Sequence, residues 1–197
     1  GCMQISFEPQ QALRVINEAK SIAVVTAAPA GADAVCAMLA FYHTFKVFKK
    51  IRLVVPEAVP EACFNLPESS LIEKDLGPKK LGINLDTNGV SLEKVTYSME
   101  GKTFKLILHP QRRAFDVERI TYENLGFSYD LFIFFGLKQI AQVAPLFNYD
   151  LGEVYKNSSL NLDAGLGNEK FASVNLVDEE ATSICDHFFK MLGYWRI

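Results

Sequence analysis

The sequence predicts an α/β protein with a doubly wound, mostly parallel sheet flanked by helices. The first sign is the segment from Ser21 to Lys50, where a short β-branched apolar run leads through a Pro and Gly turn into apolar residues spaced three and four apart. An apolar run without polar alternation is typical of a parallel strand covered on both faces. The second sign is Tyr129–Gly136, the most apolar run in the chain, which we expect to be the central strand.

The N-terminal third alternates between helices and strands. Amphipathic spacing with an early proline predicts a helix over Pro9–Lys20, which leads into the strand that starts at Ser21. Asp33 is a plausible N-cap for the next helix. Ile51–Pro56 predicts a second buried strand, and the three prolines in Pro56–Pro67 indicate a loop with at most a short helix.

The middle of the chain is less apolar and predicts an insertion. A strand is expected near Leu81–Leu85. The alternation in Leu92–Ser98 and Thr103–His109, around a glycine turn, predicts a β-hairpin insertion near residues 92–109.

The C-terminal part returns to strands and helices. The Asp and two Glu residues at 178–180 predict the start of a closing helix, with Asp178 as its N-cap and Gly193 at its end. The expected elements are strands over Val117–Tyr122, Leu160–Asp163 and Phe171–Val177, helix and loop over Gln139–Tyr155, and the closing helix over Asp178–Leu192.

The composition favours a single globular domain and argues against a nucleic-acid-binding or membrane protein. The 197 residues, 49% of them hydrophobic, suffice for a single domain over residues 3–197. A formal net charge of −3 gives no drive towards nucleic acid or anionic membranes, and no apolar run approaches the roughly 18 residues of a membrane span. We expect a cytoplasmic protein without membrane contact. The scattered cysteines predict reduced thiols, and they are Cys2, Cys36, Cys63 and Cys185.

Three motifs carry a resemblance to a known family. Thr26 to Ala34 reads Thr-Ala-Ala-Pro-Ala-Gly-Ala-Asp-Ala, the run Tyr129–Gly136 follows, and Asn161 to Gly165 reads Asn-Leu-Asp-Ala-Gly. In this order they resemble the motifs of the DHH phosphoesterases, the family of RecJ-type nucleases, oligoribonucleases and phosphoadenosine-phosphate phosphatases. Members commonly show Thr-His-x-Asn-Pro-Asp-Gly-Asp-Ala, an apolar strand that ends in Asp, and Asn-Ile-Asp-His-His. The resemblance implies their fold over nearly the full length.

The same resemblance implies that the metal centre is degenerate. Active members hold two metal ions, usually manganese, which generate the nucleophilic water. Only the carboxylates of Asp33 and Asp163 remain, which are too few for a binuclear site. We therefore expect no catalytic residue, no metal and no cofactor, with manganese as the cofactor in the alternative case of an active enzyme. The vestigial metal-site positions fall on Ala27, Gly31, Asp33, Gly136, Asp163, Ala164 and Gly165.

The family's C-terminal substrate-binding domain carries a Gly-Gly-Gly-His signature, which the residues up to Ile197 lack, and we expect that domain to be absent.

Each retained feature also has a structural interpretation. Asp33 is more often a simple helix cap, and Asp163 is more often hydrogen-bonded to nearby backbone. The turn Pro29, Ala30, Gly31 and Ala32 could hold a phosphate through backbone N–H groups, although it lacks a glycine-rich fingerprint and a P-loop lysine.

Aromatic residues are more numerous than a small sheet should bury alone, so some could form an interaction surface, although core packing is the default. Those considered are Phe41, Tyr42, Phe45, Phe48, Phe132, Phe134, Phe135, Phe188, Phe189 and Trp195.

Three functions remain open at this point. The first is a catalytically inactive phosphoesterase-like domain that binds or scaffolds, with an unknown protein partner or as a homodimer. The second is a relic that holds a nucleotide or short oligonucleotide without cleaving it. The third is an active metal-dependent phosphoesterase.

Overall fold

The computed structural model describes residues 8–197, which divide into two compact units. Residues 8–78 and 127–197 form the first, which we call the α/β unit, and residues 79–126 form the second, the ribbon unit. We expected a single domain over residues 3–197, whereas the described chain clusters into these two parts. Residues 3–7 and Cys2 lie outside the described residues.

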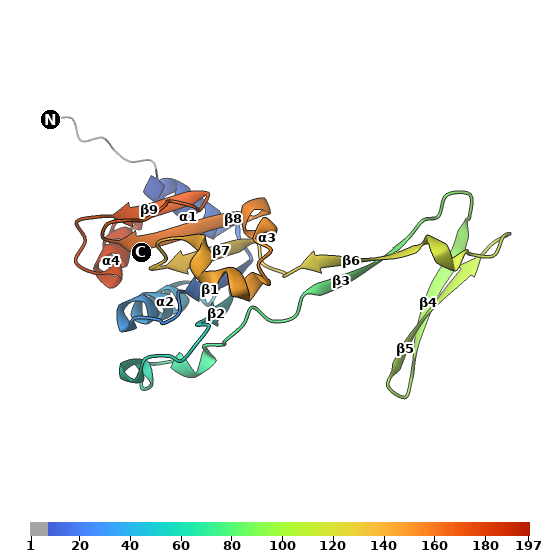
Figure 1. The fold of residues 1–197 in the computed structure, drawn as a ribbon, viewed down its shortest axis with the longest axis horizontal. Coiled ribbons are helices and arrows are strands. Elements are labelled where there is room, and N and C mark those ends of the chain that lie inside the picture. The colour runs from blue at the N-terminus through green and yellow to red at the C-terminus, as the bar shows by residue number, and fades with distance from the viewer. Residues whose placement is uncertain (1–7) are drawn as a thin grey trace. The chain divides into compact units, whose positions relative to one another are not determined.

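The α/β unit is built on a five-stranded parallel sheet in the order β2-β1-β7-β8-β9 (Figure 1). The order places β7 at the centre, as expected for the most apolar run, and every residue of β7 is buried. The predicted fold class is confirmed. The strands are β1 Ser21–Thr26, β2 Lys50–Val54, β7 Leu131–Phe135, β8 Ser158–Ala164 and β9 Val174–Asp178.

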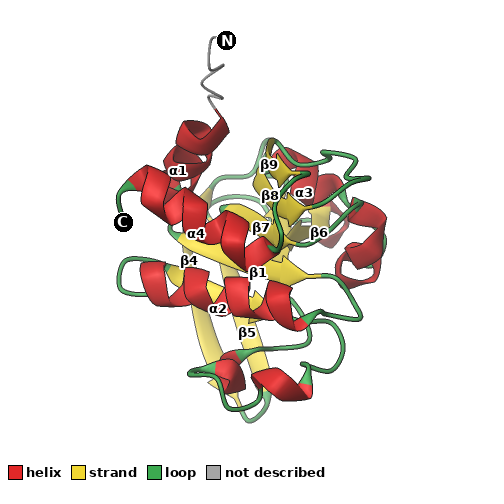
Figure 2. Ribbon diagram, turned by 90° about the vertical axis from the view of Figure 1, so that its left-hand side faces the viewer, coloured by secondary structure: helices red, strands yellow, loops and turns green. Residues whose placement is uncertain are grey.

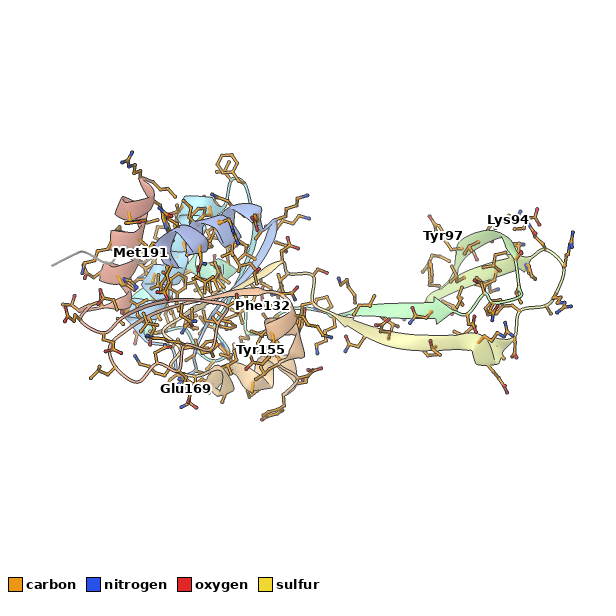
Figure 3. The ribbon with its side chains drawn as sticks, turned by 90° about the horizontal axis from the view of Figure 1, so that it is seen from above. Lys94, Tyr97, Phe132, Tyr155, Glu169 and Met191 are labelled. Atoms are coloured by element: carbon orange, nitrogen blue, oxygen red, sulfur yellow. The ribbon has the colours of Figure 1, made fainter. Side chains whose placement is uncertain are left out.

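Alternate residues of the strands supply two separate apolar layers. Ile22 and Val24 of β1 belong to the larger layer, whereas Ala23 and Val25 belong to the smaller one. Phe132, labelled in Figure 3, lies in the smaller layer. Because both faces are apolar, the sheet needs a cover on each side.

Helices supply both covers. On the larger layer α2 and α4 lie side by side and α1 packs beside α4 (Figure 2). Residues of the 3-10 helix η4 and of α3 belong to the other layer. None of the described helices is long and apolar enough to cross a membrane. Their bounds are α1 Glu8–Glu18, α2 Ala32–Phe45, η4 Ile140–Phe147, α3 Gly152–Lys156 and α4 Ile184–Trp195, with short 3-10 turns η1 Glu61–Cys63 and η2 Ser69–Leu71.

The predicted start of the closing helix was wrong. Helix α4 begins at Ile184, where the Ser183 hydroxyl accepts a hydrogen bond from the Asp186 N–H. The Asp178 carboxylate instead accepts from the Glu180 N–H, which closes a turn between β9 and the helix. Gly193 also lies inside α4 rather than beyond its end. An Asp that is followed by acidic residues suits a turn as well as a helix start.

The ribbon unit consists of two antiparallel two-stranded sheets. In one, β3 Lys80–Leu85 pairs with β6 Ile120–Gly126, and in the other β4 Leu92–Glu100 pairs with β5 Thr103–Pro110. The predicted hairpin near residues 92–109 is confirmed. The strand expected over Val117–Tyr122 is partly wrong, because η3 Val117–Arg119 is a 3-10 turn and β6 starts at Ile120.

Most of the aromatic residues considered in the sequence fill the core of the α/β unit. Phe41, Phe135 and Phe188 contact one another and are almost fully buried, whereas Phe48 and Phe189 are exposed. Core packing therefore accounts for most of the aromatic excess.

His187 is a buried imidazole in the α4 helix. Its Nε2 lies 3.1 Å from the Leu176 carbonyl oxygen, and because that oxygen can only accept, Nε2 carries the proton. Burial lowers the pKa of His187 from its ordinary value of 6.5 by penalising the charged ring, while the nearby carboxylates of Asp178 and Asp186 oppose the shift and Lys190 adds to it.

This shift predicts that the folded protein loses stability in acid. As pH falls below 6.5, the unfolded chain takes up a proton at this ring before the folded chain does, so the free energy of unfolding falls as pH drops towards the folded pKa. Urea unfolding at a series of pH values between about 7.5 and 5 measures the slope. His187→Gln should flatten it relative to the exposed control His43→Gln, and equal slopes for both variants would contradict the assignment.

Candidate functional site

The carboxyl edge of the parallel sheet gathers the predicted site positions. Thr26 at the end of β1 pairs with Phe135 of β7, which in turn pairs with Leu162 of β8, so the three strands end together. Gly31 and Asp33 follow β1 in the turn and the first turn of α2. The role of these positions as former metal ligands stays a prediction. The residues at or directly beyond the strand ends are Ala27, Gly136, Asp163, Ala164 and Gly165.

Gly136, which directly follows β7, is a glycine for structural reasons. Its φ of +74° lies in the left-handed region, where a side chain is strained. A Cβ built there would lie 2.7 Å from Cδ1 of Ile184 and 3.5 Å from Cβ of Ala34. A carboxylate at this position would therefore require both a strained backbone and a displaced Ile184.

Asp33 caps a helix, but not the one on which it lies. The N-cap of α2 is Gly31, and Asp33 belongs to the first turn. Its two carboxylate oxygens accept hydrogen bonds from the backbone N–H groups of Ile184 at 2.6 Å and Cys185 at 3.0 Å. The expected cap of its own helix was wrong, and Asp33 instead satisfies the open N-terminus of α4.

Asp163 is buried, and it is paired with side chains. Its Oδ2 accepts from the Lys138 ammonium at 2.7 Å and from Nδ2 of Asn168 at 2.8 Å. Asn168 is itself held by the Leu137 carbonyl at 2.7 Å. The expected partners were backbone groups, so that interpretation was wrong. The Asp163 side chain is 3% exposed, and an unpaired charge there would be strongly unfavourable.

Lys138 provides a cation at the centre of this edge. Its ammonium also donates to the Ala164 carbonyl at 2.8 Å, and it lies 3.7 Å from where a Cβ of Gly165 would be. The sequence analysis missed this residue. The one available signal was position, because Lys138 lies two residues beyond Gly136 and therefore near the carboxyl end of the central strand.

The donor set of this edge does not fit a binuclear metal centre. Within residues 8–197, no group of three His, Cys, Asp or Glu side chains is placed to hold a metal ion. Both oxygens of Asp33 accept helix N–H groups, and Asp163 already neutralises a lysine. A metal ion would therefore compete with the α4 N–H groups for Asp33 and with the Lys138 ammonium for Asp163.

The turn from Pro29 to Ala32 lies at the same edge and is exposed except at Ala30, which is partly buried. Gly31 has open space around it, and no side chain caps the first N–H groups of α2. Phosphate binding by Pro29, Ala30, Gly31 and Ala32 stays a prediction.

Cys185, Asp186 and His187 do not form a catalytic group. Burial, with the nearby Asp33 and Cys36, raises the pKa of the Cys185 thiol to about 12. Its Sγ donates to the Asp33 carbonyl at 3.3 Å. Each of the three residues has different partners, so the thiol is protonated and lacks a base.

A shallow groove of 540 Å³ lies elsewhere in the α/β unit, between α1 and α4. Arg14 and Tyr194 are among the residues that line it, and none of the predicted site residues does.

Comparisons with known proteins agree with the fold. No protein-family model matches the sequence, and no curated protein matches it. Among solved structures, an exopolyphosphatase-related protein from Bacteroides fragilis matches with a TM-score of 0.63 at 13% identity, over 98% of this chain and 45% of that chain. The chain shares the fold of this exopolyphosphatase-related protein. At this identity the likeness shows the fold alone, and the chain spans less than half the length of its structural neighbour.

The cap on α4 predicts a loss of stability in Asp33→Ala. Two N–H groups at a helix N-terminus would lose their acceptor, which should lower the free energy of unfolding by about 1–2 kcal/mol. Chemical denaturation measures the change, and Asp33→Asn, which keeps one carbonyl acceptor, should fall between the two proteins. Asp186→Ala removes a partly exposed carboxylate from the same helix turn, one that pairs with Lys190 rather than with a backbone N–H, and serves as the control. An equal loss in that control would argue against a capping role.

The ion pair of Lys138 and Asp163 predicts strong coupling in a double-mutant cycle. Lys138→Met leaves a buried carboxylate without its cation and should lower the free energy of unfolding by about 2–3 kcal/mol. Adding Asp163→Asn removes the unpaired negative charge and should raise the free energy of unfolding again by at least about 1 kcal/mol. Urea denaturation of the four proteins gives the coupling energy. Strictly additive effects would show that the two groups do not interact in solution.

Proposed function

We propose that this chain is a catalytically inactive, DHH phosphoesterase-like domain that acts by binding or scaffolding. The observation that supports the proposal most is the state of the two retained carboxylates. Asp33 is bound to the N-terminus of α4, and Asp163 is bound to Lys138. Each carboxylate has a partner within the fold, and a metal ion would compete with that partner for it.

Phosphoester hydrolysis at a two-metal site depends on carboxylates that can bind metal ions. A two-metal site needs exchangeable positions at which water is activated and phosphate oxygens are held. The Lys138 ammonium neutralises charge but cannot serve as an exchangeable Lewis acid. Gly136 adds a second obstacle, because its φ of +74° strains any side chain and a Cβ there would displace Cδ1 of Ile184.

Metal analysis and an activity assay test the proposal together. The purified protein, dialysed against manganese and analysed for bound metal, should hold much less than one ion per chain. It should not turn over a labelled short oligoribonucleotide, phosphoadenosine phosphate or inorganic polyphosphate in the presence of manganese. Stoichiometric metal, or turnover that Asp163→Asn abolishes while the far-ultraviolet spectrum is unchanged, would establish an active phosphoesterase instead.

A thermal-shift assay separates binding of a partner from binding of a nucleotide. We expect no stabilisation by a panel of nucleotides in the absence of metal. If nucleotides do stabilise the protein, Gly31→Asp provides the control, because it places a negative charge at the start of α2 in open space. Stabilisation that this variant abolishes would replace the scaffold proposal with a nucleotide-binding one.

A further inference from the structure

The β4–β5 hairpin of the ribbon unit has three successive apolar pairs on one face. Successive side chains of a strand point to opposite faces, so the pairing register decides which residues share a face. Three directly opposed pairs lie on one face, which we call the dry face. They are Val95 with Leu108, Tyr97 with Leu106 and Met99 with Phe104.

The opposite face of the same hairpin is polar. It carries the pairs Lys94–His109, Thr96–Ile107, Ser98–Lys105 and Glu100–Thr103. Figure 3 labels Tyr97 and Lys94, which are an odd number of residues apart on β4 and so belong to opposite faces. The alternation is that of a strand pair with one face in water and the other buried against a second layer.

Within the ribbon unit, no second layer covers the dry face. Its side chains are exposed by 41–75%, apart from Leu108, which is half-buried. The Tyr97 and Phe104 rings stack on each other, 5.7 Å apart, within this face. A two-stranded hairpin is marginal in water and needs packing on one face to be stable. An apolar surface of this size on a protein marks a site of interaction.

We propose that the dry face packs against the dry face of a second copy of this chain, so that two hairpins form a symmetric, two-layered interface. The inference rests on the proposed binding function and names its partner. A two-fold arrangement brings identical surfaces together, and the three pairs of the dry face are suited to this because none of them contains a charged side chain. Glu93 precedes them on β4, at the register shift between Leu92 and Lys94.

The available area is sufficient for a dimer. The five more exposed side chains of the dry face present on the order of 500 Å² per copy, judged from their exposure and the usual area of such side chains. Two copies would bury roughly 1,000 Å² in total, the lower bound for a specific interface. Further area is available on β3 and β6, where Leu81, Ile83 and Tyr122 are also exposed.

The charge of the ribbon unit favours a second copy over a strongly charged partner. Residues 79–126 contain eight Lys and Arg against six Asp and Glu, which leaves a formal charge of +2. Two such units repel each other weakly at physiological salt. Neither an anionic membrane nor an acidic partner is specifically selected by so small a charge.

Analytical ultracentrifugation of the full chain over a range of concentrations tests the inference. The wild-type protein should pass from monomer to dimer with a dissociation constant in the micromolar range, as an interface of this size allows. A monomer at every concentration would overturn the inference. Binding of the monomer to vesicles would also overturn the inference, because the dry face would then contact lipid. The vesicles to test are neutral phosphatidylcholine and anionic phosphatidylserine.

Neighbouring residues of β5 provide a matched pair of variants. Leu106 lies on the dry face with 41% exposure, and Ile107 lies on the opposite face with 39% exposure. Leu106→Lys should weaken dimerisation at least tenfold because it buries an ammonium in the interface, whereas Ile107→Lys should leave it within about twofold. Equal effects of the two variants, or a dimer insensitive to Leu106→Lys, would place the interface elsewhere and overturn the inference.

Hydrogen exchange gives a second readout that needs no variant. In the wild-type protein, amides of β4 and β5 should exchange more slowly as concentration rises, since dimerisation suppresses local opening of the hairpin. Exchange independent of concentration would contradict a dimer through this hairpin. Both experiments are done without metal or substrate, so their failure leaves the question of hydrolysis untouched, and turnover by the protein would leave the dimer intact.

Discussion

The ion pair of Lys138 and Asp163 is the interaction on which the chemistry of this edge of the sheet depends. A carboxylate at the end of a buried strand must be compensated, because the sheet shields it from water. Here the compensation comes from the chain itself, through an ammonium that also bonds the Ala164 carbonyl. A cation that is covalently part of the protein cannot exchange with solvent ions, so the electrostatic requirement that a metal could fill is already met.

The N-terminus of α4 occupies the rest of the same edge. The backbone N–H of Ile184 donates to Asp33, and Cδ1 of Ile184 lies 2.7 Å from where a Cβ of Gly136 would be. These two contacts depend on each other, since the hydrogen bond that docks α4 also brings Ile184 over the glycine. The N-terminus of α4 therefore both binds the Asp33 carboxylate and lies against Gly136.

The sequence predicts the layers of this protein better than its contacts. Apolar runs and helical spacing identify the parallel strands, because burial on both faces leaves a clear local pattern. The start of α4 was misplaced, since Asp178 has the composition of a cap while the bonds that fix the helix come from Ser183 and from Asp33, some 150 residues earlier in the chain. The role of Lys138 was not predicted for a similar reason. Its partner Asp163 lies 25 residues away, and no local signal links the two residues.

The β4–β5 hairpin also shows that the sequence predicts elements better than contacts. Its alternation correctly predicted two strands, and the sequence also implies one face that excludes water, but the position of the covering layer is not a local property. In the α/β unit each apolar face of the sheet is covered by helices of the same chain. On β4 and β5 the apolar residues stay exposed, Tyr97 and Phe104 among them. The ribbon unit itself supplies no second layer, which is the observation behind the proposed contact with a second copy.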